Sequence, residues 1–198
     1  MLREVKNVLT KEECNTIIDY CRPRLKRSKV VDGDGGMADH QLCSHRTSRG
    51  CWIESPYPHT QEYQEIIEKV RDTITRYSAL PSDNQEYPYQ ILNYQVGEHY
   101  KLHQDNFEKD KEYYKHIEGT GGQRVFSIIL YLNEVGEGGE TEYPYIPMKI
   151  KPEIGKMVIH QNIKGNKILK ESTHEALPVL KGEKWVLVNW VRVNKYTN

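Results

Sequence analysis

A histidine and an aspartate stand two positions apart, at His103 and Asp105, in a segment whose apolar and polar residues alternate. In a β-strand, residues i and i+2 point to the same face, so this pair would present an imidazole and a carboxylate side by side. An imidazole from a distant strand would complete a face of two histidines and one carboxylate. Such a face binds Fe(II) and leaves open positions for a co-substrate and O2. The spacing therefore indicates a candidate iron centre.

Two histidines compete for the third ligand position. His174 lies in the segment THEALPVLKGEKWVLVNWVR, in which Lys184 follows ten residues later at the start of an alternating strand. His160 also has a lysine ten residues after it, Lys170, but that lysine lies in a polar loop with no strand behind it. We therefore expect His174 to be the ligand and His160 to be a histidine of the core or of the pocket edge.

Lys184 itself indicates an anionic ligand. An ammonium group that is buried without a partner is costly, so a lysine at the start of an inner strand needs a negative charge beside it. A dicarboxylate co-substrate would supply that charge. The lysine and the histidines together therefore favour an iron site that also holds an organic acid. A structural zinc site is disfavoured, because two histidines and one aspartate without sulfur suit an open catalytic site better.

The composition excludes several other classes of protein. The 28 Lys and Arg residues balance 28 Asp and Glu, which argues against nucleic-acid or membrane-surface binding. The longest apolar run, from Val125 to Leu132, is interrupted by Ser127 and is far shorter than the about 20 residues of a membrane span. Because the N-terminal residues also lack an apolar signal segment, we expect a cytoplasmic protein. Its 198 residues suit a single domain, 1–198.

The first third of the chain predicts two helices. Thr10 and Glu13 have the spacing of a capping box, and Pro23 ends the helix that follows. A second helix is expected from about Thr60 to Ser78, where apolar residues recur at helical spacing. The residues of this stripe are Tyr63, Ile66, Ile67, Val70, Ile74 and Tyr77. We expect the stripe to pack against a sheet.

From Pro88 onward the apolar period changes to two, which indicates short strands separated by turns. Many short strands after a pair of helices predict a closed or double-layered, mostly β structure with helices packed outside, of the α+β class. The expected strands are 89–96, 99–105, 124–132, 148–150, 156–161 and 184–193.

Four cysteines, Cys14, Cys21, Cys43 and Cys51, lie in the first quarter of the chain, and none forms a C-x-x-C pair. Free, partly buried thiols are the expected state. A disulfide, or a zinc site completed by His40 or His45, remains an alternative at this point.

Five stretches of the chain resemble the catalytic domain of prolyl 4-hydroxylases, within the Fe(II)/2-oxoglutarate dioxygenases. They are NVLTKEECNTIIDYC, RTSRGCW, YQVGEHYKLHQDNF, GGQRVFSIILYLNEVGEGGETEYP and THEALPVLKGEKW, and the resemblance covers nearly the whole chain. It implies a double-stranded β-helix core, of the jelly-roll or cupin-like kind, at about 86–198, with helical support at about 1–85. It also implies that His103, Asp105 and His174 bind iron.

The resemblance assigns further residues to ligands. Lys184 would pair with the distal carboxylate of 2-oxoglutarate, and Tyr94 and Thr141 would hydrogen-bond to the same group. Contacts to a peptide substrate are implied for Arg46, Ser48, Tyr100, Arg124 and Trp190. The aromatic rings among them suit a proline ring, which is flat, apolar and without an N–H. His160 departs from the family pattern, where an aromatic or apolar residue is usual, and would make the pocket more polar.

The implied activity is hydroxylation of prolyl residues in a peptide or protein. O2 and 2-oxoglutarate are consumed, succinate and CO2 are released, and ascorbate is the expected reductant. Segments 31–50 and 106–122 are candidate lids. The alternatives are the same chemistry on a free amino acid, a lysyl residue or another small molecule, and a catalytically silent module that binds proline-rich peptides. No nucleic-acid or membrane partner is expected, and the chain is expected to be a monomer or a homodimer.

Overall fold

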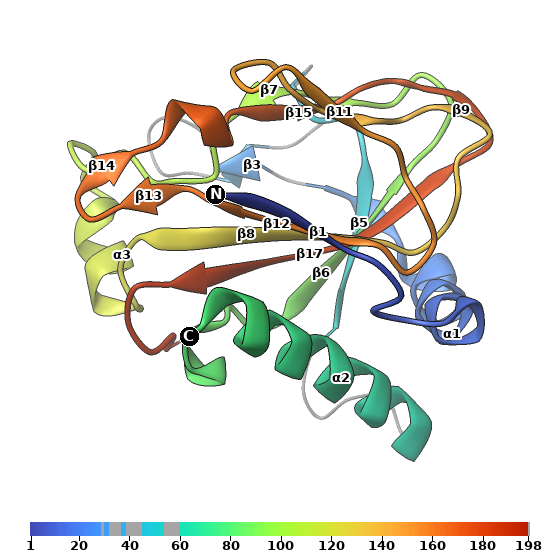
Figure 1. Cartoon of the computed structure of the whole chain (residues 1–198), viewed down its shortest axis with the longest axis horizontal. Coiled ribbons are helices and arrows are strands. Elements are labelled where there is room, and N and C mark those ends of the chain that lie inside the picture. The colour runs from blue at the N-terminus through green and yellow to red at the C-terminus, as the bar shows by residue number, and fades with distance from the viewer. Residues whose placement is uncertain (29, 32–36, 39–44, 54–59, 198) are drawn as a thin grey trace.

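The chain forms two facing antiparallel β-sheets, with helices packed outside the larger one (Figure 1). The computed structural model describes residues 1–28, 30–31, 37–38, 45–53 and 60–197. Most of the expected candidate lid at 31–50 therefore lies outside the described residues, as does Cys43. The expectation of a mostly β structure with flanking helices is confirmed.

The larger sheet has seven strands, and every neighbouring pair within it is antiparallel. Across the sheet the strands are β1 (Leu2–Val5), β12 (Met157–Gln161), β8 (Arg124–Tyr131), β17 (Lys184–Arg192), β6 (Tyr89–Tyr94), β5 (Arg49–Ile53) and β2 (Lys26–Arg27). β17 lies at the centre and pairs with both β6 and β8. This central position holds its side chains in place from both sides.

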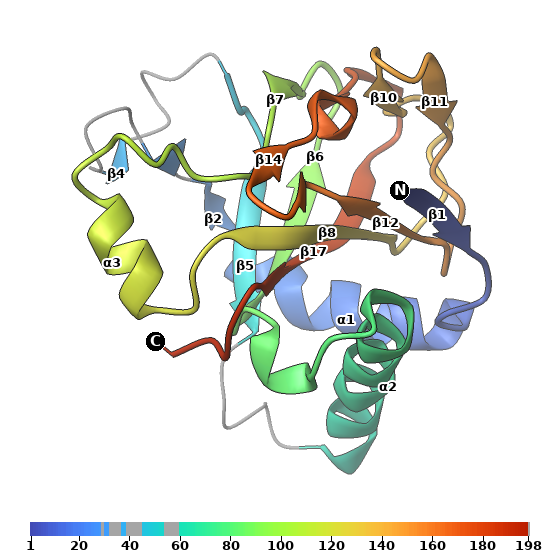
Figure 2. The ribbon, with the colours of Figure 1, turned by 60° about the vertical axis from the view of Figure 1, so that its left-hand side comes forward.

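The smaller sheet has four strands and carries two of the expected metal ligands. Its order is β11 (Met148–Ile150), β10 (Thr141–Tyr143), β15 (His174–Ala176) and β7 (Tyr100–His103). Three short strand pairs complete the described β structure: β13 (Ile163–Lys164) with β14 (Lys167–Ile168), β16 (Val179–Lys181) with β9 (Glu137–Gly138), and β3 (Val30–Val31) with β4 (Met37–Ala38). Figure 2 shows the smaller sheet above the larger one.

The two expected helices are present, and a third short helix was not expected. α1 (Lys11–Cys21) begins with the capping box, in which Thr10 accepts from the Glu13 backbone and Glu13 accepts from the Thr10 backbone. α2 (Gln61–Ser78) buries Tyr63, Ile66, Ile67, Val70 and Ile74. The unexpected helix is α3 (Tyr114–Gly119), and single 3-10 turns occur at Arg22–Arg24, Ser82–Asn84 and Lys170–Ser172.

The expected strands all occur, each within a few residues of the expected bounds. Two of the strands that were not expected, β1 and β5, extend the larger sheet on its two sides. β1 has the sequence LREV and β5 has RGCWI, and neither shows a clear alternation of apolar and polar residues. Their strand state comes from pairing with β12 and β6, which a local pattern does not reveal.

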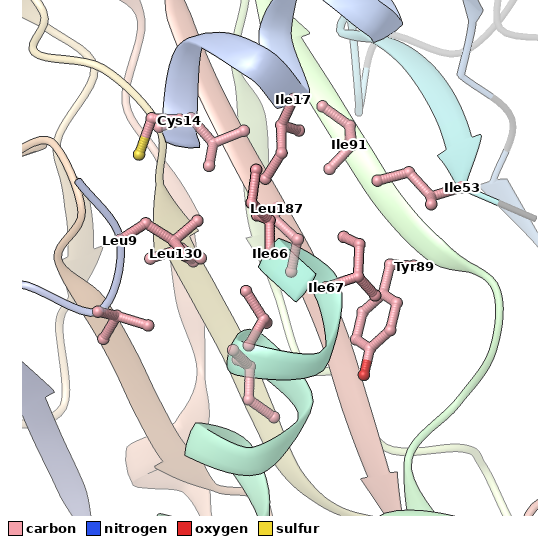
Figure 3. Packing of buried hydrophobic residues seen from close by; sticks show 14 of the residues in the cluster. Leu9, Cys14, Ile17, Ile53, Ile66, Ile67, Tyr89, Ile91, Leu130 and Leu187 are labelled. Atoms are coloured by element: carbon pink, nitrogen blue, oxygen red, sulfur yellow. The ribbon is translucent and has the colours of Figure 1, made fainter. Parts of the chain in front are cut away.

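Alternation along the central strands divides the core into two layers. Leu187 of β17, Leu130 of β8 and Ile91 of β6 face the helices and pack with Ile17 and Ile67 (Figure 3). The neighbouring positions on the same strands face the smaller sheet, where they form a second cluster. Lys184 has the same parity as the second set, so its side chain lies between the sheets.

Three cysteines are described, Cys14, Cys21 and Cys51, and all are buried thiols outside any disulfide. The expectation of reduced cysteines is confirmed for these three. Among the described residues, no helix has the length and apolar character that crossing a membrane requires.

Candidate active site

A cavity of about 870 Å³ lies between the two sheets. The smaller sheet contributes His103, His174 and Thr141 to its lining, and the larger sheet contributes Lys184 and Trp190. The strands that carry these residues are far apart in the sequence. The cavity therefore collects most of the residues that the sequence predicted to act together.

The three expected metal ligands converge at one point of this cavity. His174 of β15 pairs directly with His103 of β7, and one ligand atom from each of His103, Asp105 and His174 lies within 4.8 Å of the others. The His103 Nε2 is 3.6 Å from Asp105 Oδ1, and the His174 Nε2 is 3.8 Å from Asp105 Oδ2. This is the only such cluster of His, Cys, Asp and Glu side chains in the described part of the chain.

Both imidazoles are oriented in the same way. The Nδ1 of His103 lies 2.8 Å from the carbonyl oxygen of Lys101, and the Nδ1 of His174 lies 2.8 Å from that of Ser172. A carbonyl only accepts, so each Nδ1 carries the proton and each Nε2 lone pair is left for a metal. Burial also lowers the pKa of His103 to about 3, with the neighbouring His174 as the next cause. His103 is therefore neutral at physiological pH.

Asp105 is ionised and held in position by groups that the sequence analysis did not identify. Burial by itself raises the pKa of Asp105, but His174, His103 and Arg124 outweigh it and hold the pKa well below its usual range. Ser127 donates to Asp105 Oδ2 at 2.6 Å and accepts from Asn162 Nδ2 at 2.8 Å. The only sequence signal for Ser127 was that it interrupts an apolar strand.

His160 lies behind the ligands and does not join them. It is buried, its ring centroid is 4.7 Å from that of His174, and its Nδ1 is 2.9 Å from the Tyr143 hydroxyl. It belongs neither to the ligand cluster nor to the cavity lining. The structure thus places His160 in the core, while His174 lies in the cluster with His103 and Asp105.

Lys184 lines the cavity from the start of β17 in the larger sheet. Its side chain is 2% exposed, and it makes no ion pair with any described residue. Burial lowers the pKa of Lys184 to about 7, and the more distant Glu140 opposes this shift. The rings of Tyr94 and Tyr131 lie 5.5 Å and 5.6 Å from its Nζ. This ammonium group is suited to an anion that enters the cavity.

Tyr94 and Thr141 flank this lysine as the sequence analysis expected. Tyr94 pairs with Lys184 across β6 and β17, and both Tyr94 and Thr141 line the cavity. Tyr131, which was not predicted, donates to Thr141 Oγ1 at 2.7 Å. Because the Thr141 oxygen is thereby used as an acceptor, its own proton is available to a carboxylate in the cavity.

Arg124 lines the cavity, but its guanidinium group is already paired. It donates to both carboxylate oxygens of Glu86, from Nε at 2.6 Å and from Nη2 at 2.9 Å, and its Nη1 lies 3.5 Å from the Asp105 carbonyl oxygen. Arg192 also donates to Glu86 Oε1. The Arg124 guanidinium lies 3.8 Å from the ring centroid of Trp190. Its observed contacts are those of a residue that positions Trp190.

Arg46 and Ser48 differ in their access to the cavity. Arg46 lines it and donates to Gln90 Oε1 at 3.0 Å, with its guanidinium 5.1 Å from the ring centroid of Tyr100. Ser48 is fully buried, does not line the cavity and accepts from Arg46 Nε at 3.2 Å. The structure therefore does not bring Ser48 to the cavity, because its hydroxyl faces Ser28 and Arg46 in the interior.

Two aromatic residues predicted to contact a substrate both line the cavity. The ring of Tyr100 is stacked on His103, with centroids 3.7 Å apart and an interplanar angle of 18°. Burial raises the pKa of Tyr100 to about 12, so its hydroxyl remains a donor. Trp190 stands on the opposite sheet. The cluster of His103, Asp105 and His174 thus shares its cavity with the rings of Tyr100 and Trp190, which together form an aromatic wall.

The side chains present fit both expected ligands. The two Nε2 atoms and the Asp105 carboxylate form a donor set of two imidazoles and one carboxylate, which suits Fe(II) with open positions. Lys184 is a buried cation without an ion pair in the described part of the chain, and hydroxyl groups stand beside it. This end of the cavity fits the distal carboxylate of 2-oxoglutarate.

The comparisons with known proteins agree with this site. A model of the 2OG-Fe(II) oxygenase superfamily matches residues 89–192. Probable prolyl 4-hydroxylase 8 of Arabidopsis thaliana is 30% identical over 211 residues, which cover 96% of this chain and 68% of the relative. Prolyl 4-hydroxylase 13 of the same plant is 31% identical over 207 residues, which cover 96% of this chain and 70% of the relative.

Solved structures share the fold. The 2OG complex of the viral collagen prolyl hydroxylase from Paramecium Bursaria Chlorella virus-1 has a TM-score of 0.72 at 24% identity, over 96% of this chain and 95% of that chain. A prolyl-4-hydroxylase from Pseudomonas putida has a TM-score of 0.62 at 19% identity, over 96% of this chain and 91% of that chain. These similarities confirm the expected jelly-roll core.

The fold, the ligand cluster and the family match define a 2-oxoglutarate-dependent dioxygenase. The chain belongs to the 2OG-Fe(II) oxygenase superfamily. Within that superfamily it is a member of the prolyl 4-hydroxylase family.

Proposed function

We propose that this enzyme hydroxylates prolyl residues in a peptide or protein substrate, with Fe(II) and 2-oxoglutarate. The observation that carries the proposal is the joint presence, in one cavity, of the ligand cluster and of the buried cation Lys184 beside an aromatic wall. The curated relatives that are prolyl 4-hydroxylases support the same choice of substrate. Ascorbate is the proposed reductant that keeps the iron in its ferrous state.

Each residue of the site has a proposed task. His103, Asp105 and His174 hold Fe(II), which when bound supplies the activation of O2 that an organic side chain does not provide. Lys184 and Thr141 bind the distal carboxylate of 2-oxoglutarate and so orient its keto acid end toward the metal ligands. The buried position of this carboxylate excludes water from the ion pair and strengthens it.

The substrate is proposed to bind against the aromatic wall. Tyr100 and Trp190 line the cavity from opposite sheets, and such rings suit the flat, apolar pyrrolidine ring. Arg46 lies beside Tyr100, while Arg124 is held by Glu86 and supports Trp190. In this proposal the arginines position the aromatic rings, and the rings hold the proline with one C–H directed toward the ligand cluster.

The direct test is an assay of succinate formation with Fe(II), 2-oxoglutarate, ascorbate and air. Proline-containing peptides should raise the rate and gain one oxygen atom, as detected by mass spectrometry. The same peptides with alanine in place of proline are the matched control and should leave the rate at its basal value. Succinate formation that proline and alanine peptides affect equally would overturn the prolyl assignment and move the substrate to a free amino acid, a lysyl residue or another small molecule.

A further inference from the structure

A second hollow, of about 540 Å³, lies beside the active-site cavity. Residues of α3 and of the β13–β14 hairpin line it. Both elements lie at the end of the larger sheet where β8 begins (Figure 1). Tyr114 and Glu118 line it from α3, and Asn166 lines it from the hairpin. None of these three residues lines the active-site cavity, so the hollow has polar lining residues that the active site does not share.

The two hollows adjoin at one shared lining residue. Ile168 of β14 lines both of them and is 38% exposed. The chain segment after Asp105 forms a partition between them, because Phe107 and Tyr113 face the active site whereas Lys109 faces the second hollow. A polypeptide that leaves the active site over Ile168 would therefore enter the second hollow directly.

The partition between the hollows is held firmly. Gln123 is buried, and its side-chain amide donates to the Phe107 carbonyl oxygen and accepts from the Phe107 backbone N–H, both at 2.8 Å. Arg124 adds a contact, with its guanidinium 4.6 Å from the Phe107 ring centroid. A partition fixed in this way gives the second hollow a defined wall before any substrate arrives.

Exposed apolar side chains mark two sides of the active-site cavity. Among the exposed large hydrophobic side chains of the described chain, two line this cavity. They are Trp52, which is 46% exposed, and Ile168, which is 38% exposed. They belong to β5 and β14, which lie in different sheets. An extended chain with its target residue in the cavity must leave past its walls, and on the Ile168 side the second hollow receives it.

We propose that the second hollow is a subsite for the polypeptide segment that flanks the hydroxylated residue. The amide side chains of Asn166 and Asn194 line it and suit the backbone N–H and C=O groups of an extended segment. Lys109 and Glu118 also line it, and neither forms an ion pair with another described residue, so both can pair with substrate side chains. This inference rests on the proposed function, and it specifies a polypeptide rather than a free amino acid as substrate.

Peptide length provides the first test. A short peptide around proline is compared with versions extended by about five residues on either side, which span about 17 Å when extended. Extension on one side should raise kcat/KM about tenfold, mainly through KM. Equal values for all three peptides would overturn the subsite while leaving the proposed hydroxylation intact.

A variant that fills the hollow provides the second test. Val193 is exposed and lines the second hollow, so Val193→Trp should reduce the long-to-short ratio of kcat/KM to about one. Glu112→Lys is the matched control, because Glu112 lies on the same partition segment and lines neither hollow. In Glu112→Lys the long-to-short ratio of kcat/KM should stay at the wild-type value. A wild-type ratio in Val193→Trp would overturn the subsite.

Binding without turnover separates the two proposals. The long peptide carries a fluorophore, and anisotropy is measured with Mn(II) and 2-oxoglutarate in the absence of O2. If Val193→Trp weakens this binding about tenfold but no peptide is ever hydroxylated, the subsite stands and the proposed function fails. If binding of the long peptide is absent or insensitive to Val193→Trp, the subsite is overturned whatever the turnover.

Discussion

The hydroxyl of Ser127 donates to Asp105 Oδ2 at 2.6 Å, and Asn162 donates in turn to the same hydroxyl at 2.8 Å. This chain of hydrogen bonds links β8 and the residue after β12 to the carboxylate of the proposed metal ligand Asp105. It orients Asp105 before a metal binds, which is the role that partners behind the ligands have in metal sites.

Replacing Ser127 tests this role directly. Ser127→Ala should weaken Fe(II) or Mn(II) binding about tenfold or more, because the carboxylate loses its fixed orientation. The measurement is an anaerobic titration of metal into the protein. Ser78→Ala, which changes another buried serine at the end of α2, should leave metal affinity unchanged. Wild-type metal affinity in Ser127→Ala would refute the orienting role.

The third-ligand assignment predicts different results for two neighbouring histidines. His174→Ala should lower metal affinity at least about 100-fold, because a ligand is lost. His160→Phe should keep affinity within about threefold, although it leaves the Tyr143 hydroxyl unpaired and costs about 1–3 kcal/mol of stability. Both are measured by the same titration, with circular dichroism as the check on folding. Loss of metal binding in a folded His160→Phe variant would make His160 a ligand.

The buried charge of Lys184 should destabilise the ligand-free protein. The pKa of Lys184 is about 7 in the folded chain against an ordinary value of 10.5, so below pH 7 the folded protein carries the full cost of burying this charge. Between pH 7 and pH 10.5 the unfolded chain still holds the proton that the folded chain has lost. The free energy of unfolding therefore rises with pH in this range, until the cost of the buried charge has disappeared. Lys184→Met should therefore raise the free energy of unfolding by about 2–4 kcal/mol at pH 6 and by less at pH 9.

Urea denaturation at the two pH values measures this effect. A Lys184→Met protein that is less stable than the wild type at pH 6 would show that the ammonium group has a compensating partner in the free protein. The same variant should lose affinity for 2-oxoglutarate, which links the stability gain to a functional loss.

The same titration makes 2-oxoglutarate binding dependent on pH. The ammonium form of Lys184 pairs with the distal carboxylate, and the free protein loses that proton above about pH 7. The dissociation constant should therefore rise toward tenfold per pH unit above pH 7 and level off below it. Anaerobic titration with Mn(II) present measures it. A 2-oxo acid without the distal carboxylate is the control and should lack this dependence; a flat profile for 2-oxoglutarate would exclude Lys184 as its partner.

Glu86 neutralises two guanidinium groups behind the aromatic wall. Glu86→Gln would leave Arg124 and Arg192 close together without their shared carboxylate. Unfolding free energy should fall by about 2–4 kcal/mol, because two buried cations lose their partner. Asp83→Asn is the control, since its ion pairs with Arg71 and Lys195 are exposed and should each contribute less than about 1 kcal/mol. Equal effects of the two substitutions in urea denaturation would contradict this account.

Local patterns in the sequence were sufficient for much of the fold. The capping box of Thr10 and Glu13, the apolar stripe of α2 and the alternation in β17 each depend on neighbours within a few residues. The same is true of His103 and Asp105, whose two-residue spacing predicts a shared face on any strand. These features are set by backbone periodicity, so a sequence contains them without a tertiary model.

The contacts between distant segments needed the tertiary structure. Ser127 and Asp105, Tyr131 and Thr141, and Glu86 and Arg124 are separated by at least ten residues and meet only when the strands pair. Strand pairing, which depends on packing and not on local pattern, also placed β1 and β5 in the larger sheet.

The sequence by itself thus determined which residue types were available for iron and 2-oxoglutarate, and it placed His103 in the strand that became β7 and Lys184 at the start of the strand that became β17. Only the tertiary structure decided that Arg124 is held by Glu86, that His160 lies behind His174, and that a second hollow adjoins the active site. The physical reason is that hydrogen bonds and cavities depend on distances between side chains, and those distances arise from the packing of segments far apart in the chain.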